Sequence, residues 1–236
     1  MGITVATIVR DERRRFLPSA LECWSEFADR IVAVDDGSKD GTHQLLEEHG
    51  CEVYRETFDL WGNETAARKF LWQKAVKDSE WVIHIDADMV PANNFIDALT
   101  GSLVGFRVYD LWDDERRYRS DRWWTGHRRP YWTAANVHKH QDAKWVWGDA
   151  GIHSGHLPLN VREQLGTSHP VARECSMLHY AYSRPELRRT KYEKYMAVKE
   201  QLGPRQLFHA QSIIDEMPRL ETMAFEPEWE LQWTTP

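Results

Sequence analysis

The chain has 236 residues, of which 42% are hydrophobic and 28% are charged, and its formal net charge is −7. This length suits one domain with a substantial buried core, and the acidic balance excludes a general electrostatic affinity for nucleic acid. We find no apolar run near the roughly 20 residues of a membrane-spanning helix, no signal peptide and no metal-like spacing among the three cysteines, so we expect a cytoplasmic protein with reduced thiols.

Strand-like apolar runs and amphipathic helical stretches alternate through the first 109 residues. Strands are predicted at residues 3–9, 31–34, 51–55, 81–85 and 103–109. Helices are predicted between them, at residues 16–27, 42–49, 63–75 and 91–100. This alternation with short turns predicts an α/β fold, in which helices flank a mostly parallel central sheet.

The regular pattern is lost from residue 110 to residue 173, and six of the 12 tryptophans fall there. They are Trp112, Trp123, Trp124, Trp132, Trp145 and Trp147. Because loops on a rigid scaffold usually carry recognition, we place an acceptor site in this aromatic-rich region. The alternative is that the rings pack an irregular subdomain. Beyond it we expect a strand at 175–182 and helices at 185–202 and 206–217.

Two aspartates follow the buried run at residues 81–85, in the segment WVIHIDADMVP. Open α/β sheets bind ligands at the carboxyl ends of their strands, where Asp86 and Asp88 are expected to lie. Mg²⁺ and Mn²⁺ take oxygen ligands, often one or two carboxylates with substrate phosphates. The segment therefore predicts a metal site, against the alternative of surface acids that cap a helix.

A second acidic strand end lies in RIVAVDDGSKDGT, residues 30–42. Asp35 and Asp36 end an apolar run, and Gly37 and Gly41 supply flexible backbone before the next helix. The segment suits a ligand-binding turn, and the alternative is an ordinary polar turn between a strand and a helix.

These two segments together resemble the family 2 glycosyltransferases, inverting enzymes of GT-A fold that use nucleotide sugars. The matching motifs, in chain order, are residues 7–12, residues 34–42, Ala67-Arg68, Asp86-Ala87-Asp88, and His179-Tyr180 followed by Lys191 and Tyr195. The resemblance is good over residues 3–100, returns at 175–200 and is poor between them. It implies one glycosyltransferase domain over 1–236, with a nucleotide-sugar half at 1–105 and an acceptor half at 106–236.

The resemblance also implies roles for individual residues. The metal, Mn²⁺ or Mg²⁺, would be held by Asp86, Asp88 and His179. The donor, most simply a UDP-sugar, would be bound by Thr7, Arg10, Glu12, Asp35, Asp36, Arg68, Asp86 and Lys191. His179 can instead be a buried core histidine, and Lys191 can lie on a solvated helix face.

The catalytic base is the weakest part of the match. Many relatives have His-Glu about two dozen residues before the His-Tyr pair, and this chain has His153-Ser154 there. Inversion needs a group that takes the proton of the acceptor hydroxyl. We therefore predict Asp149 as the base, with Asp121 and His153 as the other candidates.

The acceptor is left open between a glycan, a lipid-linked sugar, a protein and a modified nucleic-acid base. Nine Lys or Arg against six Asp or Glu lie between Arg107 and Lys144, interleaved with aromatic rings. Arginine beside aromatic rings suits an anionic acceptor. The alternative is that these arginines pair with Asp113, Asp114 and Glu115.

Two other classes of function remain at this stage. A nucleotidyltransferase also uses carboxylates at strand ends, although it would want a Gly-rich basic loop that VRDERRRF lacks. A catalytically inactive sugar-binding module is the second, and the intact acids and His179 argue against it.

Overall fold

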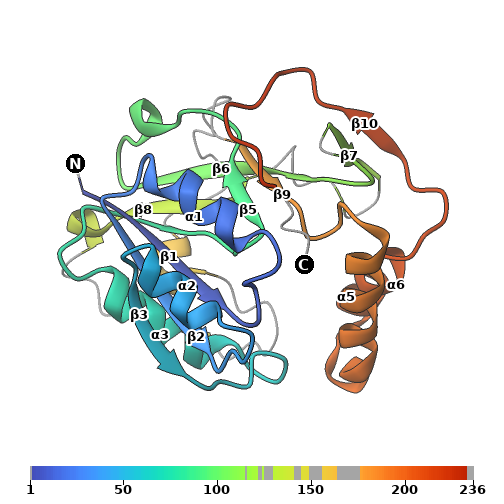
Figure 1. Cartoon of the computed structure of the whole chain (residues 1–236), viewed down its shortest axis with the longest axis horizontal. Coiled ribbons are helices and arrows are strands. Elements are labelled where there is room, and N and C mark those ends of the chain that lie inside the picture. The colour runs from blue at the N-terminus through green and yellow to red at the C-terminus, as the bar shows by residue number, and fades with distance from the viewer. Residues whose placement is uncertain are drawn as a thin grey trace.

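The computed structural model describes residues 2–114, 116–121, 124, 130–140, 145–148, 156–163 and 176–232. Over these residues, the strands of the main sheet are β1 (Ile3–Val9), β2 (Arg30–Asp36), β3 (Glu52–Glu56), β4 (Trp81–His84), β5 (Met89–Pro91), β6 (Leu103–Asp110), β8 (Pro130–Asn136) and β9 (Ser176–His179). Their order is β3-β2-β1-β4-β8-β6-β9-β5 (Figure 1). Strands β3, β2, β1 and β4 are parallel, and β8 runs antiparallel to both β4 and β6.

Helices cover both faces of the parallel half. Helices α1 (Leu17–Ser25) and α2 (Thr42–Glu48) bury their leucines in one apolar cluster with Val5 of β1. Helix α3 (Thr65–Ala75) packs on the opposite face, where Leu71 and Trp72 contact a cluster that contains Ala6. Because neighbouring strand residues point to opposite faces, β1 supplies both clusters. The predicted α/β architecture with flanking helices is confirmed.

The second half adds a pair of helices and a small sheet. Helices α5 (Pro185–Ala197) and α6 (Pro204–Ser212) lie side by side, to the right of the main sheet in Figure 1. Strands β7 (Arg117–Arg119) and β10 (Leu220–Thr222) pair antiparallel, and a short helix, α4, spans Leu159–Glu163. None of the described helices is both long and apolar enough to cross a bilayer.

The predicted elements of the first 85 residues all occur, with bounds that differ by at most two residues from those observed. The helix predicted at 91–100 is wrong. Met89–Pro91 instead pairs antiparallel with β9, and only a 3₁₀ turn, Ile96–Ala98, follows. Pro91 is tolerated because β5 is an edge strand, where a missing N–H costs no ladder bond.

The region predicted as irregular contains a central strand. Pro130–Asn136 forms β8 between β4 and β6, so the described sheet is mixed and its parallel half ends at β4. The predicted helix at 185–202 ends at Ala197, and a 3₁₀ turn covers Lys199–Gln201. The helix predicted at 206–217 spans Pro204–Ser212 instead.

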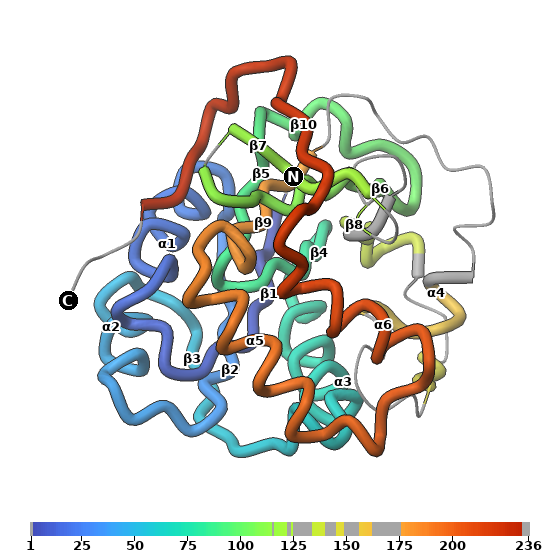
Figure 2. The backbone as a smooth tube through the Cα atoms, turned by 90° about the vertical axis from the view of Figure 1, so that its right-hand side faces the viewer, coloured from blue at the N-terminus to red at the C-terminus, as the bar shows by residue number. Residues whose placement is uncertain are grey.

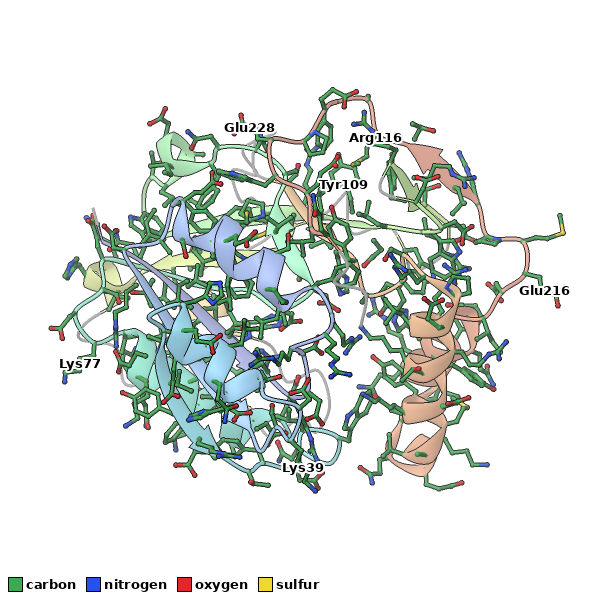
Figure 3. All side chains as sticks on the ribbon, in the orientation of Figure 1. Lys39, Lys77, Tyr109, Arg116, Glu216 and Glu228 are labelled. Atoms are coloured by element: carbon green, nitrogen blue, oxygen red, sulfur yellow. The ribbon has the colours of Figure 1, made fainter. Side chains whose placement is uncertain are left out.

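The carboxyl-terminal segment after β10 packs against the body. Met223 and Leu231 are buried in the cluster that also contains α1, and the Leu231 N–H donates to the Tyr180 hydroxyl at 3.1 Å. Arg116 and Glu228 lie along the edge of the molecule that this segment crosses (Figure 3). This segment therefore supports the strand end that carries His179.

Candidate functional site

A cavity of about 200 Å³ lies at the carboxyl ends of β1 and β4, beside α5. Its charged lining side chains are three acids and three bases: Glu12, Asp86, Asp88, Arg15, Lys191 and Lys194. Figure 2 looks onto this edge of the sheet and shows α5 on the near side of β1 and β2. The cavity thus lies where an open α/β sheet binds ligands.

Asp88 and His179 form the part of the site that suits a metal ion. The Nε2 atom of His179 lies 3.7 Å from Oδ1 of Asp88. On the other side of the ring, Nδ1 of His179 donates to Oδ1 of Asp110 at 2.7 Å. A carboxylate that holds the second ring nitrogen of a histidine is the usual support of a metal ligand, since it fixes the tautomer and the ring orientation.

The sheet explains why these three side chains meet. β9 lies between β6 and β5, and His179 is the register partner of both Asp110 and Met89. The Tyr180 N–H donates to the Asp88 carbonyl at 2.8 Å, which holds the turn after β4 against the end of β9. Asp88, His179 and Asp110 keep side-chain exposures of 18%, 10% and 17%, so they are sheltered but reachable.

Asp86 has a different set of partners, on the α3 side of the sheet. Its Oδ1 lies 3.6 Å from Nη1 of Arg68 and 3.6 Å from Nε2 of His84. Arg68 also donates to Nε2 of His84, and its Nη2 lies 3.3 Å from Glu64. The positive charge of Arg68 therefore compensates Asp86 without a metal ion.

The protonation states follow from this contact. Burial and the neighbouring Arg68 charge lower the pKa of His84 to about 4, so its imidazole is neutral at pH 7. Burial acts to raise the pKa of Asp86, but the neighbouring positive charge of Arg68 holds it well below its usual range. His84, Asp86 and His156 each offer a ligand atom within 4.8 Å of the others.

Glu12 follows β1 and lies in the cavity close to Asp88. Its N–H donates to Oγ1 of Thr42 at 2.8 Å, and its Oε1 accepts from Nη1 of Arg15 at 2.5 Å. Oε2 is buried and makes no hydrogen bond to any described residue. Burial raises the pKa of Glu12 to about 8, and the charge of Asp88 adds to this, although Arg15 opposes it.

Two lysines of α5 face these acids. Nζ of Lys191 lies 4.5 Å from the ring centroid of Tyr182, and Nζ of Lys194 lies 6.0 Å from that of Trp61. Burial and the charge of Arg15 lower the pKa of Lys194. Together with Arg15, the lysines give the cavity a cationic wall that suits phosphate oxygens.

Of the residues predicted to bind the nucleotide, Glu12, Asp86 and Lys191 line the cavity, whereas Thr7, Arg10, Asp35 and Asp36 lie at the ends of β1 and β2, outside its lining. Asp35 and Asp36 are fully buried, and Oδ1 of Asp35 accepts from the Ser38 N–H at 2.9 Å. Asp36 accepts from the Phe58 N–H at 2.6 Å and lies 3.3 Å from Arg10. The hydroxyl of Thr7 is buried without a hydrogen-bond partner among the described residues, and Oδ2 of Asp35 lies 3.5 Å from His43 and 3.7 Å from Arg55.

The three predicted base candidates are not brought together by the described structure. Asp149 and His153 lie outside the described residues. Asp121 accepts from Nε of Arg119 at 2.6 Å and does not line the cavity. Burial acts to raise the pKa of Asp121, but Arg119 outweighs it and lowers the pKa, which makes Asp121 a weak proton acceptor.

Two of the tryptophans assigned to acceptor binding are packing residues. Trp112 and Trp124 are buried, and the Arg119 guanidinium carbon lies 4.8 Å and 5.0 Å from their ring centroids. Trp145 and Trp147 pack partly buried against the cluster on the α3 face. Trp123 and the side chain of Trp132 lie outside the described part of the chain. The packing alternative therefore holds for the tryptophans that the structure describes.

Several arginines proposed to meet an anionic acceptor are paired with acids. Arg117 contacts Asp114 at 2.6 Å, and Arg116 contacts Glu226. Arg119 is also paired, with Asp121 and Asp215. Arg122, Arg128 and Arg129 lie outside the described residues. The cations that line the cavity are instead Arg15, Lys191 and Lys194.

Sequence reasoning gave no role to His84, Asp110, Arg15 or Lys194. His84 stands two residues before Asp86, so strand alternation places it on the same face, and this signal was present. Lys194 stands three residues after Lys191 on one helix face. Asp110 gave no local signal, because it reaches His179 only through the pairing of β6 with β9.

Comparisons with known proteins identify the family and the fold. Residues 4–163 match the model of the family described as Glycosyl transferase family 2. Mannosyl-3-phosphoglycerate synthase from Rubrobacter xylanophilus is 16% identical, with a TM-score of 0.50 over 92% of this chain and 77% of that chain. Glucosyl-3-phosphoglycerate synthase from Mycobacterium tuberculosis, solved with Mn²⁺, UDP and glucosyl-3-phosphoglycerate, is 14% identical, with a TM-score of 0.48 over 94% and 87%. No curated protein matches the sequence.

Proposed function

The chain belongs to glycosyl transferase family 2, and from this premise we propose that it moves a sugar, with inversion, from a UDP-sugar to a separate acceptor. The observation that carries the proposal is the group of Asp88, His179 and Asp110 beside a cavity with a cationic wall. A nucleoside diphosphate is the leaving group that needs both a metal ion and cations, because negative charge builds on it as the glycosidic bond breaks.

The side-chain atoms of Asp88 and His179 suit a divalent metal ion. Two ligands that each bind at about 2.1 Å can be at most about 4.2 Å apart, and Asp88 Oδ1 and His179 Nε2 are 3.7 Å apart. A mixed oxygen and nitrogen pair suits Mn²⁺ better than Mg²⁺, which prefers oxygen ligands. When bound, the ion would act as a Lewis acid on the diphosphate. Asp88 and His179 would hold it, and Asp110 would orient His179.

The remaining predicted residues divide between the two ends of the donor. Asp35, Thr7, Arg10 and Asp36 would border the base, where the Thr7 hydroxyl makes no hydrogen bond to a described residue. Asp86 and Arg68 would contact the ribose or diphosphate, and Arg15, Lys191 and Lys194 would contact phosphate oxygens. Glu12 lies between these groups and would accept a hydrogen bond from a donor hydroxyl. In this arrangement most donor contacts come from residues 1–105, and residues 106–236 supply the acceptor side together with His179 and the lysines of α5.

We place the catalytic base at Asp149, with His153 in reserve. Asp121 is the weaker candidate, because Arg119 lowers its pKa. Asp149→Asn should remove sugar transfer and leave donor binding unchanged, since a base acts on the acceptor hydroxyl. Loss of donor affinity in this variant would place Asp149 at the nucleotide, and full activity would move the base to His153 or Asp121.

For the acceptor we propose a molecule with a hydroxyl group and a negative charge. Both solved structures named above are 3-phosphoglycerate glycosyl synthases, and their acceptor is of this class. Support from this chain comes from its cavity cations, since most of the described arginines of the aromatic region are already paired. Acceptor affinity that falls steeply with ionic strength supports this proposal, and a salt-insensitive affinity contradicts it.

A panel of nucleotide sugars tests the function directly. Thermal shift with and without Mn²⁺ should show stabilisation by one donor, and this stabilisation should require the metal. The same donor should be slowly hydrolysed, with inverted configuration at the anomeric carbon. Binding without hydrolysis or transfer would indicate an inactive sugar-binding module, and pyrophosphate release from a sugar phosphate and a nucleoside triphosphate would indicate a nucleotidyltransferase.

A further inference from the structure

The imidazole of His84 is a buried group that the proposed reaction does not yet use. His84 ends β4 and is 4% exposed, so its ring nitrogens need partners inside the protein. Val82 packs against Leu71, Trp72 and Ala75 of α3, and alternation along the strand turns His84 to the same face. The next turn of α3 toward its start carries Arg68, whose Nη1 donates to Nε2 of His84.

This contact fixes what His84 can do. A guanidinium has only donors, so Nε2 must offer its lone pair and the ring proton must sit on Nδ1. The same Nη1 atom lies 3.6 Å from Oδ1 of Asp86, and Nη2 lies 3.3 Å from Glu64. Arg68 is therefore held from three sides, with its side chain only 10% exposed.

The same group of residues also has the composition of a metal site, since His84, Asp86 and His156 offer ligand atoms within 4.8 Å. The position of Arg68 argues against this use. Its N–H occupies the lone pair of His84 that a metal would need, and its charge lies beside the only carboxylate of the three. A cation would have to displace a guanidinium that is already hydrogen-bonded.

We propose that His84 is a positioning residue for donor binding, which holds the Arg68 guanidinium against Asp86 so that this pair, rather than a second metal ion, meets the nucleoside diphosphate. The inference rests on the proposed function, because it assigns Asp86 and Arg68 to the donor. The proposal gives the two aspartates of the Asp-Ala-Asp motif different roles. Asp86 is compensated by Arg68, and Asp88 with His179 remains for the metal.

The test uses the full chain and measures the affinity for nucleoside diphosphates, of which UDP is the first, by calorimetry in the presence of Mn²⁺. His84→Leu removes the hydrogen-bond acceptor of Arg68. It should weaken UDP binding about tenfold, which is the effect of losing a hydrogen bond to a charged group. His84→Gln places an amide oxygen near the position of Nε2 and should stay within about threefold of wild type. His138→Leu, at an exposed histidine, is the matched control and should change nothing.

A double-mutant cycle separates positioning from a general structural role. If His84 acts through Arg68, His84→Leu should cost little further affinity in the Arg68→Met background. Equal losses in both backgrounds overturn the proposal. If His84→Leu fails to fold, Arg68→Met decides the question by itself, since UDP affinity unchanged by that variant contradicts the role.

Metal titrations test the alternative that His84 is itself a metal ligand. The Mn²⁺ concentration needed for UDP binding should be the same in His84→Leu and wild type, because Asp88 and His179 are untouched. A Co²⁺ titration without nucleotide should give equal stoichiometry for both proteins, and loss of one bound Co²⁺ in His84→Leu would make the group a metal site. A wild-type protein that binds none of UDP, GDP, ADP, CDP and dTDP overturns the proposed function, whereas wild-type binding that His84→Leu does not weaken overturns this inference alone.

Discussion

Replacing Asp110 tests the metal site through a residue that would not itself contact the ion. Asp110 accepts a hydrogen bond of 2.7 Å from Nδ1 of His179, and its side chain is 17% exposed. Removal of such a supporting carboxylate typically costs about 10- to 100-fold in metal affinity, and each factor of ten corresponds to about 1.4 kcal/mol. Asp110→Asn keeps an oxygen acceptor but loses the charge, so we expect about tenfold. Asp110→Ala loses both, so we expect the upper end of the range.

The assay is a Mn²⁺ titration of UDP-sugar turnover. The half-saturating Mn²⁺ concentration should rise, and the rate at saturating Mn²⁺ should stay near wild type, because Asp110 acts on ion binding. Asp114→Asn is the control, since this acid is 44% exposed and pairs with Arg117. A Mn²⁺ requirement in Asp110→Ala equal to that of the control would refute the reasoning, as would a loss of activity that Mn²⁺ does not restore.

Three further outcomes follow from the geometry. Asp88→Ala should abolish transfer and Mn²⁺-dependent UDP binding with little change in melting temperature, and transfer near the wild-type rate would contradict the metal site. Glu12 has a folded pKa raised from 4.5 to about 8, so the folded state keeps a proton that the unfolded state loses, and stability falls as pH rises between these values. Glu12→Gln removes this pH dependence of the free energy of unfolding. Measured by denaturant unfolding, the stability of the variant relative to wild type should therefore grow from pH 5 to pH 8. A difference in stability that stays constant over this range would contradict the raised pKa of Glu12. Lys191→Met with Lys194→Met should weaken UDP binding at low salt and flatten its salt dependence; UDP affinity that keeps the wild-type salt slope would remove the cationic wall from donor binding.

The sequence predicted the half of the fold in which each element is specified locally. The strands and helices up to residue 85 follow from short-range apolar periodicity, and their turns contain glycine and capping residues. The helix expected at 91–100 failed because Met89–Pro91 gains a strand partner, β9, that is distant in the chain. β8 was missed for a similar reason, since its central position depends on pairing with β4 and β6.

The residues of the candidate site also divide into those that a local sequence pattern reveals and those that only the folded structure reveals. Asp86 and Asp88 could be found because two acids after an apolar run are a local pattern, and His179 because a motif resemblance marked it. The supporting residues could not be found so easily. His84 has the appearance of an ordinary strand residue until Arg68 is placed beside it. Trp112 and Trp124 appeared suited to ligand stacking, but both are buried, and each ring packs against the other and against the buried Arg119.

Asp86 and Asp88 leave the same strand two residues apart, yet their partners come from different parts of the chain. Arg68 and His84, the nearest charged or polar partners of Asp86, belong to the half of the sheet that packs around β1 and α3, and His156 of the second half lies beside them. His179 reaches Asp88 only when β9 pairs with β6 and β5. A slip of one residue in that pairing would turn His179 to the opposite face of the sheet. Metal affinity is therefore coupled to the docking of β9, whereas the contact between Asp86 and Arg68 involves no residue of β9. The Asp-Ala-Asp motif thus joins an aspartate whose nearest partners lie on α3 and β4 to one whose histidine partner reaches it only through β9.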